Sequence, residues 1–232
     1  MFKKLFAKKR MKERSHPERE FDWAMSFVRE ALEYEKTNED KIVILDFMLG
    51  LIREDLKTSL MTSIFYYEEP VKISLPFPSE YEDQSGKLVK VKTDKSQQRE
   101  IDLAKDCVFA VAWHRERLRD TIKNLFHNPF EFRKENHRAN YYPYLDICHA
   151  YNGLHSITSG IGHKKGIIKA DVIDITPLFN HIYTDGNCWF NQHNHNKLWE
   201  LWDFRIGVIF EVAKIKYRLE KTFKESVFSQ NS

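Results

Sequence analysis

Glycine is scarce and unevenly placed in this sequence, and its distribution limits the folds that the chain can adopt. Eight of the 232 residues are glycine, about half of the usual ~7%, and five of the eight lie between Gly153 and Gly186. Glycine allows the positive-φ turns that other residues resist, so tight turns are expected to gather in this segment. The glycine-poor remainder is expected to be mainly long helix.

Apolar residues recur at helical spacing in four segments. They predict helices over Phe21–Leu32 and Ile42–Ile64, a third from Lys95 to Phe126 and a last from Lys197 to Phe223. Around the Gln84–Gly86 turn, the pattern instead predicts a small hairpin. The expected fold class is therefore α+β, with long helices around a small mixed β/α unit in the C-terminal half.

These elements fit one domain preceded by a short tail, since domains commonly hold ~100–200 residues. The expected divisions are a basic tail at 1–15 and a single α+β domain at 16–232. The domain is expected to consist of a mainly helical part at 16–126 with the hairpin at 71–93, a β/α unit at 127–196 and a C-terminal helix at 197–223. The β/α unit contains most of the glycines, and a functional site is expected there.

The positive charge of the chain is concentrated at its N-terminus. Residues 1–14 hold seven Lys or Arg and one Glu, a local charge of +6, so the rest of the chain sums to −3 against a net charge of +3. The overall charge therefore implies no large nucleic-acid-binding face, and the positive potential is confined to the tail. The tail itself could contact a membrane surface or a nucleic acid through Phe2, Leu5 and Phe6, or remain a solvated terminus, and these alternatives stay open.

The cysteines and the apolar runs indicate the compartment. Cys107, Cys148 and Cys188 are odd in number and lack a CxxC spacing, so a disulfide framework is not expected. The longest apolar run, Ile42–Ile52, is interrupted twice and is far shorter than the ~20 residues that cross a bilayer. We therefore expect no transmembrane segment and a cytoplasmic location.

The segment 144–166 holds the strongest signal for a site. A predicted strand runs through Asn152 and Gly153 directly into a short helix that carries His155 and Ser156. A helix N-terminus has a partial positive charge and unpaired N–H donors, so it suits a phosphate or a carboxylate. The same pattern also fits a purely structural turn with Ser156 as a helix cap. Both interpretations stay open.

These residues also resemble a known family. The turn reads Asn-Gly-x-His-Ser and follows an Asn-Pro-x-x-x-Arg box that ends at Arg133, which is similar to the ParB/sulfiredoxin-like superfamily. The resemblance implies a phosphate-binding turn formed by Gly153, His155 and Ser156, with Arg133 as the box arginine. Together with the Asn-His and Asp-Gly pairs on either side, the turn also resembles a family of small bacterial proteins whose function the resemblance does not supply.

Other polar residues near this turn could take part in the chemistry. His137 is expected in a polar loop, where it could act with His155 as a general acid or base, while Arg133 or Arg138 could clamp an anionic group. A solvated connection is the alternative. At 114–120, charges of alternating sign predict a solvated helix face, with a phosphate-facing arginine cluster as the alternative.

Histidines suggest a second kind of site. Eight of the ten lie between His127 and His195. His193 and His195 alternate, so on a strand both imidazoles would face one side and could chelate a divalent metal such as Zn, Mn or Mg. A solvated loop is the alternative.

Two classes of function follow. In the first, the strand–turn–helix site binds a nucleotide or a nucleic-acid phosphate, with phosphoester or nucleotide hydrolysis as the reaction class if the protein is an enzyme. In the second, the protein is a non-enzymatic interaction or structural protein whose aromatic-rich helices form a homodimer or another interface.

Overall fold

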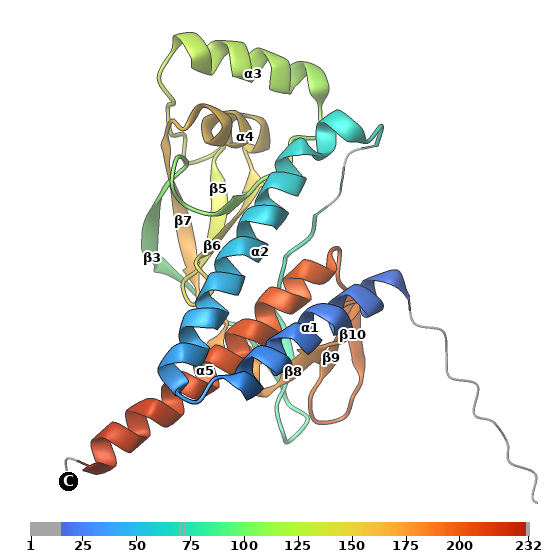
Figure 1. The fold of residues 1–232 in the computed structure, drawn as a ribbon. Helices are drawn as coiled ribbons and strands as arrows, with labels where there is room; N and C mark the ends of the chain where they lie inside the picture. The colour runs from blue at the N-terminus through green and yellow to red at the C-terminus, as the bar shows by residue number, and fades with distance from the viewer. Residues whose placement is uncertain (1–14, 70, 72, 231–232) are drawn as a thin grey trace, which may run out of the picture.

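The computed structural model describes residues 15–69, 71 and 73–230 and has an α+β fold (Figure 1). Five α-helices surround strands arranged in sheets of two, three and five among these residues. The fold class therefore agrees with the prediction. Residues 1–14, to which the membrane-surface and nucleic-acid contacts were assigned, lie outside the described residues.

The first two helices begin at side-chain caps. α1 (His16–Tyr34) starts after Ser15, whose hydroxyl accepts the N–H of Glu18 while the Glu18 carboxylate accepts the N–H of Ser15. α2 (Asn38–Tyr66) starts after Thr37, whose hydroxyl accepts a backbone N–H of the first turn. Both confirm the first two predicted helices.

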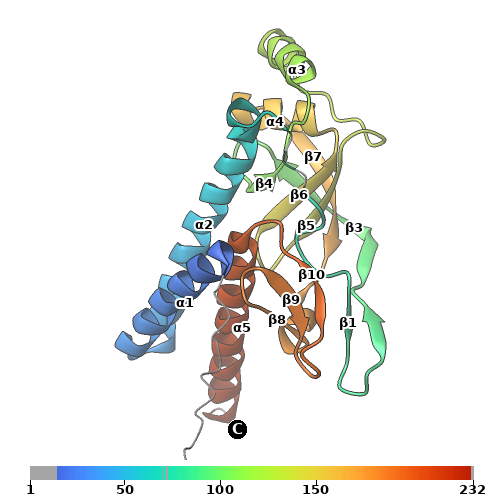
Figure 2. The same ribbon diagram turned by 90° about the vertical axis from the view of Figure 1, so that its right-hand side faces the viewer.

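The last helix, α5 (Phe204–Gln230), packs against both α1 and α2 and also contacts the three-stranded sheet (Figure 2). That antiparallel sheet has the order β10-β9-β8. Its strands are β8 (Ile182–Thr184), β9 (Cys188–Asn191) and β10 (Lys197–Glu200). The buried rings of Trp189 and Phe210 meet edge to face at 5.0 Å and join this sheet to α5.

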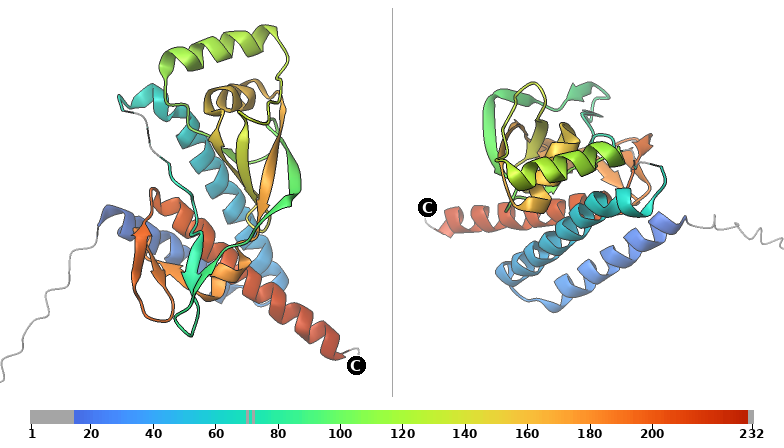
Figure 3. Two further views of the ribbon diagram at one scale, coloured as in Figure 1. Left: turned by 180° about the vertical axis from the view of Figure 1, so that it is seen from behind. Right: turned by 90° about the horizontal axis from the view of Figure 1, so that it is seen from above.

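The five-stranded sheet forms the second part of the molecule. Its strands, in spatial order, are β3 (Thr93–Asp102), β7 (Ile167–Ile173), β5 (Arg138–Tyr142), β6 (Ile147–Asn152) and β4 (Val108–Phe109). The sheet is mixed, because β4 and β6 are parallel, as are β5 and β7. α4 (Leu154–His163) packs Ile157 and Ile161 into the apolar cluster on one face. α3 (Arg115–His127) packs on the outside of α4 (Figure 3).

Two short elements complete the fold. β1 (Glu80–Glu82) and β2 (Leu88–Lys90) pair antiparallel around a turn with Gly86 at φ +80°, which confirms the predicted hairpin. A single 3₁₀ turn, η1 (Thr176–Asn180), leads into β8. None of the helices in the described ranges combines the length and the apolar character that a bilayer span requires.

The long helix expected from Lys95 to Phe126 is wrong. β3 and β4 occupy the first part of this stretch, and α3 begins only at Arg115. Apolar residues three or four apart in short runs fit a helix or a buried strand equally well. From Val108 to Ala112 every side chain is buried, so no exposed face marks the period.

Two further boundaries differ from the prediction. The polar loop expected around Arg138 is in fact the start of β5, an interior strand of the sheet. The C-terminal helix begins at Phe204 and not at Lys197, because Lys197–Glu200 forms β10. β10 pairs with the neighbouring strand β9, and β5 pairs with β6 and β7. Helical periodicity carries no information about such pairing.

Candidate functional site

Gly153 forms the turn between β6 and α4 and is the N-cap of that helix at φ +74°. A Cβ atom here would lie 2.6 Å from the His137 ring and 2.8 Å from the Asn136 carbonyl oxygen. Both the left-handed backbone and the close approach require glycine. Since glycine has no side chain, no side-chain hydrogen bond caps α4, and its first turn holds no acidic residue.

His137 is buried, 4% exposed, and is not in a solvated loop as expected. Its Nδ1 accepts the N–H of Arg133 at 3.0 Å, so the neutral ring carries its proton on Nε2. Nε2 donates to Ser156 Oγ at 2.9 Å, and that hydroxyl donates to the Gly153 carbonyl at 2.9 Å. Burial, assisted by the charge of Arg133, lowers the pKa of His137. Both ring nitrogens therefore hold the turn in place.

His155 lies on the first turn of α4 and is half-buried. Its Nε2 accepts the N–H of His114 at 3.1 Å, which leaves the proton of the neutral ring on Nδ1. The ring meets Trp113 edge to face at 5.1 Å. Burial, followed by the charges of Arg117 and His114, lowers the pKa of His155. At neutral pH His155 is therefore an uncharged donor through Nδ1.

A hollow of about 330 Å³ opens between α3 and the N-terminus of α4, and we call it the α4 hollow. The residues that line it are Arg117, Asp120, Thr121, Asn136, Gly153, His155 and Ser156. A second hollow of about 510 Å³ shares Thr121, Asn136 and Ser156 with it and adds Arg133 and His137. Most of the residues predicted for the site line one or both of these two hollows.

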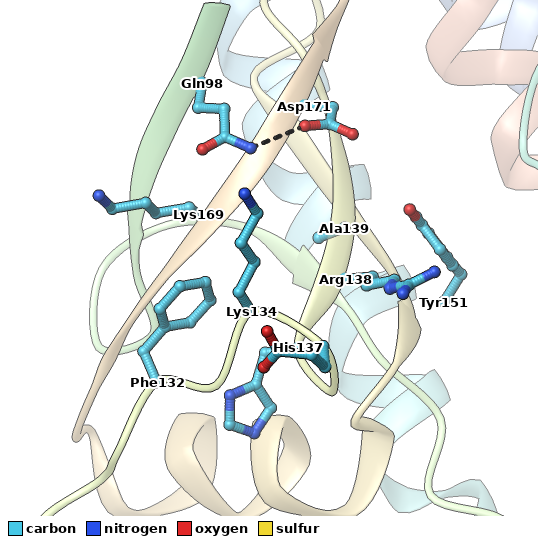
Figure 4. A pocket seen from close by; sticks show the side chains of 10 residues that line it. Gln98, Phe132, Lys134, His137, Arg138, Ala139, Tyr151, Lys169 and Asp171 are labelled. Carbon is cyan, nitrogen blue, oxygen red and sulfur yellow. Dashed lines mark hydrogen bonds between the residues drawn. The ribbon is translucent and has the colours of Figure 1, made fainter. Parts of the chain in front are cut away.

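Arg138 and Asn152 lie outside both of these hollows. Arg138 lines a separate hollow of about 500 Å³ on the sheet, which we call the sheet hollow, together with Lys134 and Lys169 (Figure 4). Gln98 donates a hydrogen bond to Asp171 in this hollow. Asn152 is exposed, and its amide donates to the Glu135 carbonyl at 3.4 Å. Arg138 therefore lies apart from the N-terminus of α4, whereas Arg133 lines the hollow beside Ser156, and the clamp expected of Arg133 or Arg138 stays a prediction.

His193 and His195 lie in the turn between β9 and β10, not on a strand as the metal hypothesis required. His193 Nε2 lies 3.0 Å from His181 Nδ1, whereas His195 Nδ1 lies 3.1 Å from the Tyr183 hydroxyl. The two imidazoles thus have different partners. Within the described part of the chain, no three His, Cys, Asp or Glu side chains are placed to hold a metal ion.

The residues of α3 are the part of the site that the sequence indicated least clearly. Arg117 lines the α4 hollow, and its guanidinium lies 5.2 Å from the Trp113 ring centre. Arg119 and Lys123 instead form ion pairs with Asp120. The stretch 114–120 therefore carries ion pairs at Arg119 and Asp120, as expected of a solvated face, while Arg117 lines the hollow; a phosphate-facing arginine cluster stays a prediction.

Comparison with known proteins gives one result. A family model described as a family of unknown function, DUF6710, matches residues 6–223. The search of curated proteins and the search of solved structures found no match.

Proposed function

The chain belongs to the DUF6710 family, and we propose that its α4 hollow binds the phosphate of a nucleotide or nucleic acid in the cytoplasm. The observation that carries the proposal is the convergence of residues with free hydrogen-bond donors. Gly153 at the uncapped N-terminus of α4, His155 with its proton on Nδ1, and Arg117 all line one hollow. Donors without acceptors favour an anionic ligand.

The one carboxylate in the α4 hollow does not cancel this preference. Asp120 is exposed, and Lys123 and Arg119 lie 3.2 and 3.8 Å from its Oδ1. Two cations therefore share this carboxylate. Charges that are this exposed are screened by solvent, so Asp120 opposes a bound anion only weakly.

Trp113 supports a nucleotide over inorganic phosphate. Its ring is 46% exposed and contacts both His155 and Arg117, which line the α4 hollow. Stacking of a base on an aromatic ring contributes about 1–3 kcal/mol and tolerates any base. The resemblance of the turn to ParB and sulfiredoxin proteins, which the family match leaves untested, favours the same ligand class.

The histidine geometry supports binding more strongly than hydrolysis. Both ring nitrogens of His137 are engaged, with Arg133 and with Ser156, so we assign it to positioning the turn. His155 keeps Nδ1 for a ligand, and in its neutral form this atom donates a proton. If the protein hydrolyses its ligand, His155 is the candidate for general acid.

Titration calorimetry with ATP and with inorganic phosphate tests the proposal. Arg117→Ala should weaken ATP binding about 10-fold, because a charged hydrogen bond contributes about 1.5–3 kcal/mol. Arg119→Ala is the matched control, since this arginine is on the same helix, is exposed and does not line the α4 hollow. Absence of ATP binding by the wild-type protein at millimolar concentration would overturn the proposal, as would equal affinities of the two variants.

The sheet hollow offers a test that distinguishes a mononucleotide ligand from a nucleic acid. Lys134, Arg138 and Lys169 line it, and it shares His137 with the hollow beside Ser156. A single-stranded oligonucleotide long enough to reach both surfaces should lose affinity in Lys169→Ala, and its binding should weaken steeply with salt. ATP binding should be unchanged in the same variant. Equal oligonucleotide affinities of wild type and Lys169→Ala would restrict the ligand to a mononucleotide.

A further inference from the structure

The first two helices carry large apolar side chains on the face that points away from the core. On α1 these are Trp23, Phe27 and Tyr34, and on α2 they are Val43, Phe47 and Leu51; we call the six residues the outer stripe. Each is more than half exposed, and Trp23 is 82% exposed. Their spacing of four and seven residues places them along one line on each helix.

The outer stripe is distinct from the face that holds the fold together. Phe21, Met25 and Val28 of α1 are buried in the main apolar cluster, as are Leu45 and Leu49 of α2. Each helix therefore has one apolar face in the core and a second apolar line in solvent. A monomer gains nothing from the second line, since exposed apolar patches larger than a few hundred Å² mark interaction surfaces.

The amount of exposed surface matches that of a specific protein interface. A large aromatic side chain offers about 150–250 Å², so six large side chains that are each more than half exposed offer on the order of 800 Å². A standard interface buries about 800 Å² on each partner. α1 and α2 follow one another in the chain and are joined by a short turn, so a two-fold axis can place each stripe on its copy.

We propose that the outer stripe is a homodimer interface, in which a second copy of this chain covers Trp23, Phe27, Tyr34, Val43, Phe47 and Leu51. An anionic bilayer is the poorer occupant, because the exposed Glu30 and Glu33 of α1 offset its exposed Arg19 and Arg29 and leave no net positive charge beside the stripe. The proposal concerns a surface other than the α4 hollow. The failure of one proposal therefore leaves the other unaffected.

Sedimentation equilibrium of the full chain tests the interface. The wild-type protein is expected to dimerise at micromolar concentration, and Phe47→Glu should raise the dimer dissociation constant about 30-fold or more, as for a central interface residue. Phe126→Glu on α3 is the matched control, because Phe47 and Phe126 are both 67% exposed on helices. This variant should dimerise like the wild type.

Three outcomes would overturn the proposal. A wild-type monomer at 100-fold higher concentration would do so, as would a dimer that Phe47→Glu leaves intact. Co-sedimentation of a wild-type monomer with vesicles of phosphatidylcholine and phosphatidylglycerol, lost in Trp23→Glu, would assign the outer stripe to lipid. Circular dichroism of each variant shows that a loss of dimer is not a loss of fold, since the substituted side chains are exposed.

Discussion

Two segments of this protein are rich in histidine, and the structure uses them in opposite ways. Between 137 and 156, His137 and His155 accept backbone N–H groups and fix the turn into α4. Between 181 and 195, His181 and His193 bond to each other near the surface, and His195 bonds to a tyrosine. Burial lowers the pKa of His181 as well, with the charge of His193 as the second cause.

The difference shows that the backbone around a histidine decides its role more than the histidine itself. In the first segment, the imidazoles of His137 and His155 accept the N–H groups of Arg133 and His114, so they connect the turn into α4 to the backbone of other segments. In the second segment, the N–H of His193 bonds to the Asn191 side chain and the N–H of His195 to the Asn191 carbonyl, while the imidazoles bond to other side chains. The first segment should therefore be sensitive to substitution, and the second should not.

The largest effect is expected from Gly153→Ala. Alanine would have to adopt a left-handed φ and would place its Cβ 2.8 Å from the Asn136 carbonyl oxygen. Neither the turn nor the Asn136 backbone can move easily, so the free energy of unfolding should fall by about 3 kcal/mol. Gly162→Ala is the control within the same helix, since nothing lies within 4 Å of its added Cβ. It should be neutral or stabilising by about 0.5–1 kcal/mol in urea denaturation. Equal loss in both variants would contradict the close approach at Gly153.

The second prediction concerns acid stability. Burial lowers the pKa of His149 from 6.5 to about 4, and neither ring nitrogen has a hydrogen-bond partner among the described residues. Below pH 6.5 His149 is protonated in the unfolded state but stays neutral in the folded state. The free energy of unfolding therefore decreases as the pH is lowered, by about 2 kcal/mol at pH 5. The raised pKa of Glu211 acts in the opposite sense.

Urea denaturation between pH 7 and pH 4.5 measures this dependence. His149→Leu removes the group and loses no described hydrogen bond, so its stability should fall less steeply over the same range. Some slope should remain, because the pKa values of His137 and His155 are lowered too. If the variant kept the wild-type slope, His149 would not be a cause of the pH dependence.

The smallest predicted effect compares the two histidine segments directly. His137→Ala leaves the Arg133 N–H without its acceptor and Ser156 without its donor, and it should cost about 1–3 kcal/mol. His193→Ala removes an exposed side chain and should change stability by less than about 0.5 kcal/mol. Thermal denaturation of both at one protein concentration separates them. A larger loss in His193→Ala would indicate a structural role for the hairpin.

Part of the fold could be predicted from local pattern. The first two helices, the small hairpin and the turn at Gly153 all follow from residues close together in sequence. The strands β3 and β4 could not be predicted this way, because their pairing partners, β7 and β6, are distant in the chain. Helical spacing in short apolar runs then gave the wrong element.

The site shows the same division. Gly153, His155 and Ser156 could be grouped from one short motif, and the structure keeps them around one hollow. Arg117 reaches that hollow from α3, which packs on α4 only in the tertiary structure. Arg138 was predicted as part of the site but lines the sheet hollow instead, because it lies on β5, whose place in the sheet is set by pairing with β6 and β7.

The sequence by itself determined where glycine is needed and that α1 and α2 are helices, because a turn and a helical period are properties of neighbouring residues. Tertiary structure alone decided that His137 is buried and that the outer stripe stays exposed among the described residues. It also decided which nitrogen of each imidazole carries the proton, through the backbone N–H that the other nitrogen accepts. These outcomes depend on packing between distant segments, which no local pattern encodes.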